Sequence, residues 1–152
     1  MKFLFVCLGN ICRSPIAHGL LKHKAAQLGL NWEVDSAGTS DWHDGELPHE
    51  RSIRTMKNHG IDITYQRSRP IRRKDLEHFD IIYVMDSNNH YDVKNMAKSE
   101  QEISKIRLVM NEVNEGMNQA VPDPWGLTEK HYEEVYEMLD EATDKIIERF
   151  SK

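Results

Sequence analysis

The chain is poor in cysteine, with only Cys7 and Cys12 among 152 residues. Two cysteines cannot form a disulfide scaffold, and a closed zinc site would need ligands from elsewhere in the chain. The eight histidines form no His-Glu-x-x-His sequence and no other dense set of metal ligands. We therefore expect neither a metal ion nor another cofactor.

Long apolar runs and an excess of positive charge are also missing. No segment is long enough to span a bilayer, and the apolar start at Met1–Val6 is too short for a signal peptide. A net charge of -5 disfavours nucleic acid as a partner. We expect a cytoplasmic protein with no membrane partner. Without repeats, low-complexity tracts or Pro/Gly/Ser linkers, residues 1–152 are predicted to form a single domain.

Apolar strands alternate with amphipathic helices along the chain. Lys2–Val6 is typical of a short buried strand. Ser14 is expected to cap a helix that has Pro15 in its first turn and Gly29 as its stop. Further strands are expected at Asn31–Asp35, Asp80–Met85 and Ile106–Met110, and further helices at Pro48–His59, Ser87–Lys98 and from Thr128 onward. This alternation predicts an α/β fold whose parallel sheet is covered by helices on both faces.

The segment Cys7–Ser14, CLGNICRS, joins the first expected strand to the first expected helix. Successive backbone N–H groups of such a loop, together with the positive end of the helix, favour an anion. Arg13 offers a planar fork that can hold two oxygens of a phosphate. The same positive field favours the ionised form of Cys7, which makes it a nucleophile. Gly9 and Asn10 tolerate the positive φ that a loop turning its amides to one centre needs.

Phosphoryl transfer also requires a proton for the leaving oxygen, and a carboxylic acid on another loop can supply it. Asp123 is the candidate, because Pro122 and Pro124 hold it in a stiff segment just before the last helix. From spacing alone, a simple turn residue remains the alternative.

The segment Cys7–Ser14 resembles the signature loop of the low-molecular-weight protein tyrosine phosphatases. Asp123-Pro124-Trp125 is similar to the Asp-Pro-aromatic motif of that family, and Asp35–Trp42 and Met85–Asn88 resemble it in the expected order. The likeness covers essentially the whole chain. It implies a flavodoxin-like three-layer sandwich, with a four-stranded parallel sheet in the order 2-1-3-4.

The resemblance implies a role for each matching residue. Cys7 would form a cysteinyl-phosphate, Arg13 would bind the phosphoryl oxygens, and Asp123 would act as general acid and then general base. The loop residues expected to surround the phosphate are Leu8, Gly9, Asn10, Ile11, Cys12 and Ser14. Of these, Ser14 would also assist the thiolate, and Asn10 would hold the shape of the loop by hydrogen bonds. Three further residues would support the loop or wall the cleft, namely Ser36, Trp42 and Trp125.

Two departures from the family pattern accompany this likeness. Trp125 and Gly126 stand where many members carry tyrosines, so regulation by tyrosine phosphorylation at this loop is not implied. Gln66 stands where relatives often have a histidine, so no supporting histidine is implied there, and Arg69 matches the family arginine.

Three other functions compete with a phosphotyrosine phosphatase. A phosphoarginine phosphatase of this fold would carry threonine where this chain has Ile11. A thiol-based arsenate reductase would need more cysteines than Cys7 and Cys12 for its relay. A silent phosphopeptide-binding module would have no need of Cys7, Arg13 and Asp123 together.

The expected partner is a phosphotyrosine-containing protein, with inorganic phosphate or vanadate as competing ligands. A monomer or weak dimer is expected. Because Cys12 lies on the same tight loop as Cys7, it is also a candidate for trapping oxidised Cys7 as a disulfide; packing is its alternative role.

Overall fold

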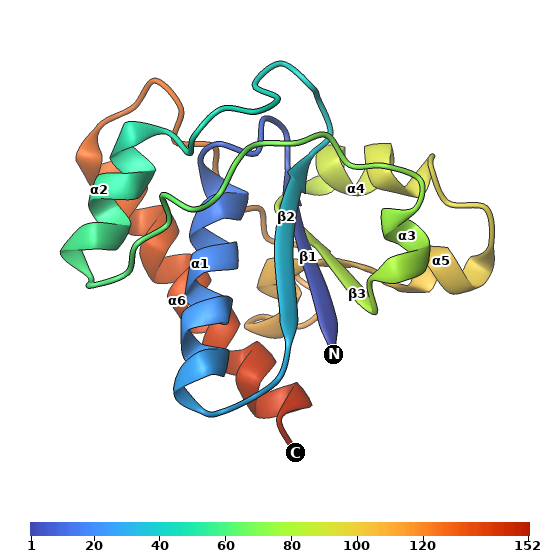
Figure 1. Ribbon diagram of the computed structural model, residues 1–152. Helices are drawn as coiled ribbons and strands as arrows, with labels where there is room; N and C mark the ends of the chain where they lie inside the picture. Colours follow the sequence, from blue (N-terminus) through green and yellow to red (C-terminus); the bar gives the residue numbers. More distant parts are fainter.

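A computed structural model describes all 152 residues of the chain. Strands and helices alternate from one end to the other (Figure 1). In chain order they are β1 (Lys2–Cys7), α1 (Arg13–Gln27), β2 (Glu33–Gly38), α2 (Glu50–Asn58), α3 (Asp75–His78), β3 (Ile81–Val84), α4 (Ser87–Lys94), α5 (Glu100–Ser104), β4 (Ile106–Leu108), the 3-10 helix η1 (Val109–Glu112) and α6 (Glu129–Phe150).

The four strands form one sheet in the order β2-β1-β3-β4, and every neighbouring pair is parallel. This confirms the predicted strand order and fold class. Residues Phe3–Val6 of the central strand β1 are completely buried, as expected for a strand covered on both faces.

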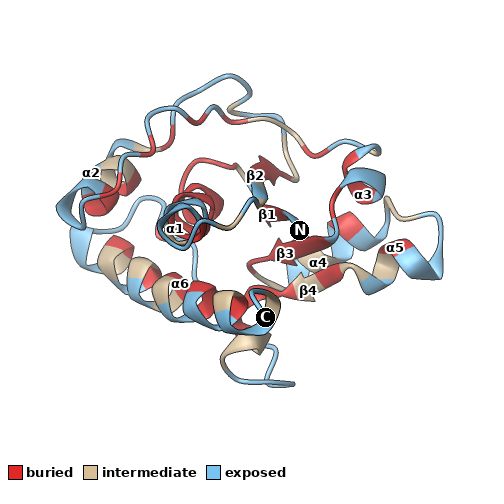
Figure 2. Ribbon diagram, turned by 60° about the horizontal axis from the view of Figure 1, so that its bottom comes forward, coloured by how far each residue is buried: buried red, intermediate tan, exposed pale blue.

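Helices cover both faces of the sheet (Figure 2). On one face α1 and α6 pack over Phe3 and Phe5, with α2 beside them; on the other, α3 and α4 pack over Leu4 and Val6. Successive side chains of β1 point to opposite faces, so one strand supplies both halves of the core. None of the helices combines the length and apolar composition that a membrane crossing requires.

Several element boundaries differ from the sequence prediction. The second strand runs over Glu33–Gly38 rather than Asn31–Asp35, because it continues beside β1 as far as Cys7. The helix expected to reach Lys98 ends at Lys94, and the fourth strand ends at Leu108, where a 3-10 turn begins. The short helices α3 and α5 were not predicted, since four or five residues carry no readable period.

The carboxyl ends of the parallel strands meet at one edge of the sheet. The loop Leu8–Cys12 follows β1, Trp42 lies beyond the end of β2, and Asp86 follows β3. In open α/β sheets this edge is where ligands bind, and the residues singled out from the sequence gather there.

Candidate active site

Five carbonyl groups along the segment Cys7–Cys12 point outward, where each accepts a hydrogen bond from a neighbouring segment. Ser40 donates to the carbonyl oxygen of Leu8, and Ser68 Oγ donates to that of Gly9 at 3.0 Å. The carbonyls of Cys7, Ile11 and Cys12 accept hydrogen bonds from Thr39 N, His49 N and Ser52 Oγ respectively. Because these carbonyls point out, the loop presents amide groups toward its centre, which is the geometry of an anion nest.

Asn10 holds the turn of this loop. Its φ of 57° confirms the predicted left-handed conformation, and its side chain bridges two segments. Nδ2 donates to Ser14 Oγ at 2.8 Å, while Oδ1 accepts from the backbone N–H of Arg69 at 3.0 Å. The same expectation was wrong for Gly9, which does not have a positive φ. A β-carbon at Gly9 would lie 3.2 Å from Cδ2 of His43, so any larger residue at this position would crowd the His43 ring.

Cys7 ends β1 at the floor of the loop and is 2% exposed. Its sulfur accepts the backbone N–H of Asn10 at 3.3 Å and lies 3.1 Å from Ser14 Oγ. The prediction that Ser14 caps α1 was wrong, because the helix begins at Arg13, with Cys12 at the cap position and no side-chain capping bond. The Ser14 hydroxyl lies against the Cys7 sulfur instead, where it can donate a hydrogen bond to a thiolate.

Arg13 lies beneath the same cavity and is 3% exposed. Its Nη1 donates to Asp86 Oδ2 at 2.8 Å and to the carbonyl oxygen of Val121 at 2.9 Å. Burial alone would lower the pKa of this guanidinium, but Cys7 and the two nearby carboxyl groups outweigh it and raise the pKa above its ordinary value. Arg13 is therefore a fixed positive charge held in one orientation.

Asp123 reaches the site from the segment before α6. Its Oδ2 lies 4.0 Å from Nη2 of Arg13, and its side chain is 47% exposed. Oδ1 accepts the backbone N–H of Trp125 at 3.1 Å, so the carboxyl group is oriented by its own turn. A carboxyl group at the mouth of the cavity can exchange protons with both a substrate and water.

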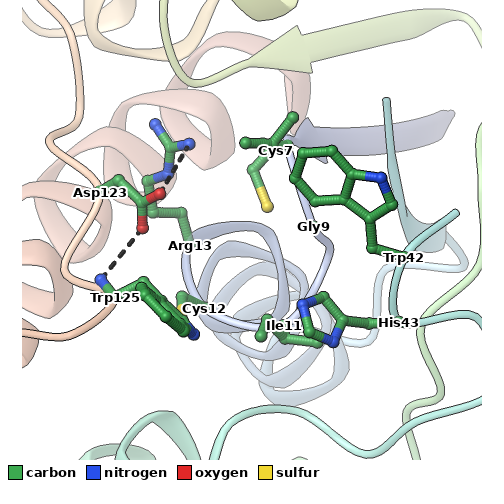
Figure 3. Close-up of a pocket in the computed structure, with 10 residues that line it drawn as sticks. Cys7, Gly9, Ile11, Cys12, Arg13, Trp42, His43, Asp123 and Trp125 are labelled. Carbon is green, nitrogen blue, oxygen red and sulfur yellow. Dashed lines mark hydrogen bonds and ion pairs between the residues drawn. The ribbon is translucent and has the colours of Figure 1, made fainter. Parts of the chain in front are cut away.

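These groups surround a cavity of about 240 Å³. Trp42 and Trp125 lie on opposite sides of the Cys7 sulfur (Figure 3). Both indoles are largely exposed, at 72% and 62%, so neither is a core residue. The cavity is lined by Cys7, Leu8, Gly9, Ile11, Cys12, Arg13, Trp42, His43, Asp123 and Trp125.

Cys12 also lines the cavity, and its buried thiol holds its proton more tightly than an exposed one would. Burial raises the pKa of its thiol to about 12, although the Tyr132 hydroxyl, 3.4 Å from the sulfur, acts in the opposite direction. Both cysteines are free thiols. No group of three or more His, Cys, Asp or Glu side chains is placed to hold a metal ion.

The Ser36 hydroxyl has its hydrogen bond with His18 rather than with the loop, where the resemblance implied it. Its Oγ lies 3.0 Å from Nδ1 of His18 on α1, which is 6% exposed. Gln66 is also buried and donates from Nε2 to the carbonyl oxygen of Pro15 at 3.0 Å. The buried histidine in this region therefore comes from α1.

Two residues of the site were given no role from the sequence. Asp86, which orients Arg13, follows β3 directly, and the rule that ligands bind at the carboxyl ends of strands could have found it. His43 lines the cavity from an irregular loop, where no periodicity or spacing gives a signal.

The chain is similar to known proteins in both sequence and fold. Residues 2–152 match the sequence profile of a family described as low molecular weight phosphotyrosine protein phosphatase. The low molecular weight protein-tyrosine-phosphatase YfkJ of Bacillus subtilis is 34% identical over 154 residues, covering 100% of this chain and 97% of the relative.

Solved structures of phosphatases are also similar to this chain. A protein tyrosine phosphatase from Entamoeba histolytica, with Hepes in its active site, has a TM-score of 0.92 and 34% identity, covering 99% of this chain and 97% of that one. A Drosophila arginine phosphatase also has a TM-score of 0.92, with 31% identity, covering 100% of this chain and 99% of that one.

Proposed function

The chain belongs to the low molecular weight phosphotyrosine protein phosphatase family, and we propose that Cys7, Arg13 and Asp123 carry out its reaction through a cysteinyl-phosphate. The observation that carries this proposal is the loop around the Cys7 sulfur, in which neighbouring segments bind five outward carbonyl groups. Such a nest is built before any ligand arrives, so the transferring phosphoryl group meets oriented donors at once.

In the first step the phosphoryl oxygens bind the loop N–H groups and the guanidinium of Arg13. The Cys7 thiolate attacks phosphorus, an S–P bond forms, and the bond from phosphorus to the tyrosine oxygen breaks. Asp123 gives its proton to that oxygen, so tyrosine leaves neutral. Ser14 holds the thiolate in place before the attack.

In the second step Asp123, now a carboxylate, takes a proton from water. The water oxygen attacks phosphorus, the S–P bond breaks, and inorganic phosphate leaves with Cys7 again a thiolate. Asp123 ends the cycle protonated, so atoms and charges balance. The proposed steps use the side chains and backbone N–H groups of the chain together with water, and no metal or other cofactor.

The cleft walls favour an aromatic substrate. Trp42 and Trp125 stand on opposite sides of the nucleophile (Figure 3), and a phosphotyrosyl ring between them would place its phosphorus over Cys7. A phosphoserine side chain lacks a ring for these walls and is shorter. Inorganic phosphate and vanadate should compete for the loop, and the sulfonate-bearing buffer Hepes occupies the active site of the Entamoeba relative.

Phosphoarginine is the second candidate substrate, because a Drosophila arginine phosphatase is 31% identical to this chain. Ile11 argues against it, since this side chain lines the cavity with hydrocarbon and offers no polar atom to a guanidinium. Steady-state kinetics on matched phosphotyrosine, phosphoserine and phosphoarginine peptides test the assignment. We expect the highest kcat/KM for phosphotyrosine, and a higher value for phosphoarginine would overturn this choice.

The site residues also bear on the domain organisation, the cellular compartment and the oligomeric state of the protein. Cys7 and Asp123 lie near opposite ends of the chain yet border one cavity, which suits a single catalytic domain over residues 1–152. The two free thiols suit a reducing compartment such as the cytoplasm. A monomer or weak dimer would leave the cleft open to a protein substrate.

A further inference from the structure

His43 lies at the edge of the cavity, between Trp42 and Ile11 (Figure 3). The mechanism above gives it no role. Its ring edge packs on the phosphate-binding loop, because a β-carbon at Gly9 would lie 3.2 Å from its Cδ2 and 3.9 Å from its Nε2. His43 thus contacts the reactive loop from the segment that carries one of the aromatic walls.

The His43 ring is held in one orientation. Its Nδ1 lies 2.9 Å from Oε2 of Glu46. A carboxylate can only accept hydrogen bonds, so Nδ1 carries the proton of the neutral imidazole and Nε2 is left as an acceptor. Two backbone bonds of 2.7 Å, between Gly45 N and Ser68 O and between Ser68 N and Glu46 O, anchor this turn. Ser68 also donates to the carbonyl oxygen of Gly9, which ties the turn to the loop.

The Nε2 atom has no hydrogen-bond partner within the protein, whereas Nδ1 has Glu46. Figure 3 shows Nε2 on the side of the ring that faces the cavity. An oriented acceptor at a binding cleft is matched by an N–H or O–H donor on the substrate. The phosphorylated side chain itself supplies no such donor, since an aryl phosphate consists of a hydrocarbon ring and acceptor oxygens. The nearest donors in a phosphotyrosyl protein are its main-chain N–H groups.

We propose that His43 is a specificity-determining residue that accepts a hydrogen bond from a main-chain N–H of the substrate beside the phosphorylated tyrosine, with Glu46 as its positioning residue. The proposal rests on the proposed phosphotyrosine phosphatase function. It explains why a polar ring stands between the apolar Trp42 and Ile11. His43 thereby distinguishes a phosphorylated polypeptide from a small aryl phosphate that fits the same loop.

The test compares two substrates on the same enzyme preparations, a phosphotyrosyl peptide and phenyl phosphate, at about pH 8, where imidazole is ordinarily neutral. His43→Phe keeps a planar ring but removes the acceptor. It should lower kcat/KM for the peptide by about three- to tenfold more than kcat/KM for phenyl phosphate, mainly through KM. His43→Gln, which can place an oxygen near the former Nε2, should recover much of the loss. His23→Phe on the exposed surface of α1 is the matched control.

A second arm changes the substrate. Peptides methylated on one backbone nitrogen at a time, at the phosphotyrosine and its two neighbours, should include one that loses affinity for wild-type enzyme but not for His43→Phe. If His43→Phe lowered kcat/KM equally for both substrates, or lowered it for neither, the proposed role of His43 would be overturned. Activity on phenyl phosphate in each variant reports folded, active enzyme, so a failure of the phosphatase function itself would appear separately as no turnover by the wild type.

Discussion

The sulfur of Cys7 lies 3.1 Å from the hydroxyl oxygen of Ser14, and that hydroxyl in turn accepts the Asn10 amide at 2.8 Å. With its acceptor position taken by Asn10, the Ser14 hydroxyl is left to donate its own proton to the sulfur. In the proposed mechanism, this hydrogen bond would stabilise the thiolate before it attacks phosphorus and again when it leaves phosphorus.

Ser14→Ala should therefore lower kcat by about ten- to a hundredfold, the loss expected for one hydrogen bond to a charged group. Steady-state kinetics on a phosphotyrosyl peptide measure this effect, with the exposed Ser104→Ala on α5 as control. An unchanged kcat in Ser14→Ala would show that this hydroxyl does not act on the thiolate.

Asp123→Asn should slow turnover of phosphotyrosyl peptide much more than that of an activated aryl phosphate. A tyrosine oxygen is a poor leaving group and needs a proton, whereas an activated aryloxide leaves without one. The two substrates should differ in the rate of the first chemical step, which pre-steady-state release of the leaving group measures.

Asp92→Asn, a change of the same kind on the exposed side of α4, is the control and should alter neither substrate. Equal losses on both substrates in Asp123→Asn would assign the proton transfer to another carboxyl group.

The sequence predicted the sheet and the loop because both are encoded locally. Buried strands appear as unbroken apolar runs such as Phe3–Val6, and the turn at Asn10 follows from a residue type that tolerates positive φ. Element ends were less predictable, because pairing with β1 extends β2 to Gly38, and that pairing is not a property of the segment itself.

Contacts made by side chains across the fold were beyond such prediction. From the sequence, Ser14 could serve as a helix cap or as a hydrogen-bond donor to Cys7, and only the folded structure shows that its hydroxyl lies against the sulfur. Ser36 pairs with His18 because α1 brings that ring beneath β2. His43 lies in an irregular loop, and only the folded structure places it against Gly9.

The buried His18 makes stability depend on pH. Burial, with smaller effects of Lys22 and Arg69, outweighs Asp35 and lowers the pKa of His18 from 6.5 to about 4. The unfolded chain therefore binds the extra proton between these pH values, so the free energy of unfolding falls as pH falls through this window. Between pH 6.5 and about 4, the free energy of unfolding should fall by roughly 3 kcal/mol in total.

Urea unfolding at a series of pH values measures this loss. His18→Gln should flatten the pH dependence across the window, while the exposed His23→Gln on the same helix should leave it unchanged. Parallel pH curves for wild type and His18→Gln would contradict the assignment.

Cys12 should protect Cys7 from irreversible oxidation, and more strongly as pH rises. Peroxide converts the Cys7 thiolate to a sulfenic acid, and a Cys12 thiolate can then displace its oxygen to form a disulfide. Because burial raises the pKa of Cys12 to about 12, little of it is ionised near neutrality, and trapping should accelerate toward alkaline pH.

The measurement is the activity that dithiothreitol restores after peroxide treatment, with and without Cys12→Ser. We expect wild type to recover more than Cys12→Ser, and the gap to widen with pH. Equal recovery at every pH would leave Cys12 with a packing role against Tyr132.

The central claim is that Cys7 carries the phosphoryl group, and trapping the intermediate tests it most directly. In Asp123→Asn an activated aryl phosphate should still phosphorylate the enzyme, while hydrolysis lacks its general base and is slow. Acid quenching followed by peptide mass spectrometry should find about one phosphoryl group per protein molecule, on the sulfur of Cys7. A phosphoryl group on another residue, or turnover with no burst of aryl release and no phosphoenzyme, would contradict the mechanism.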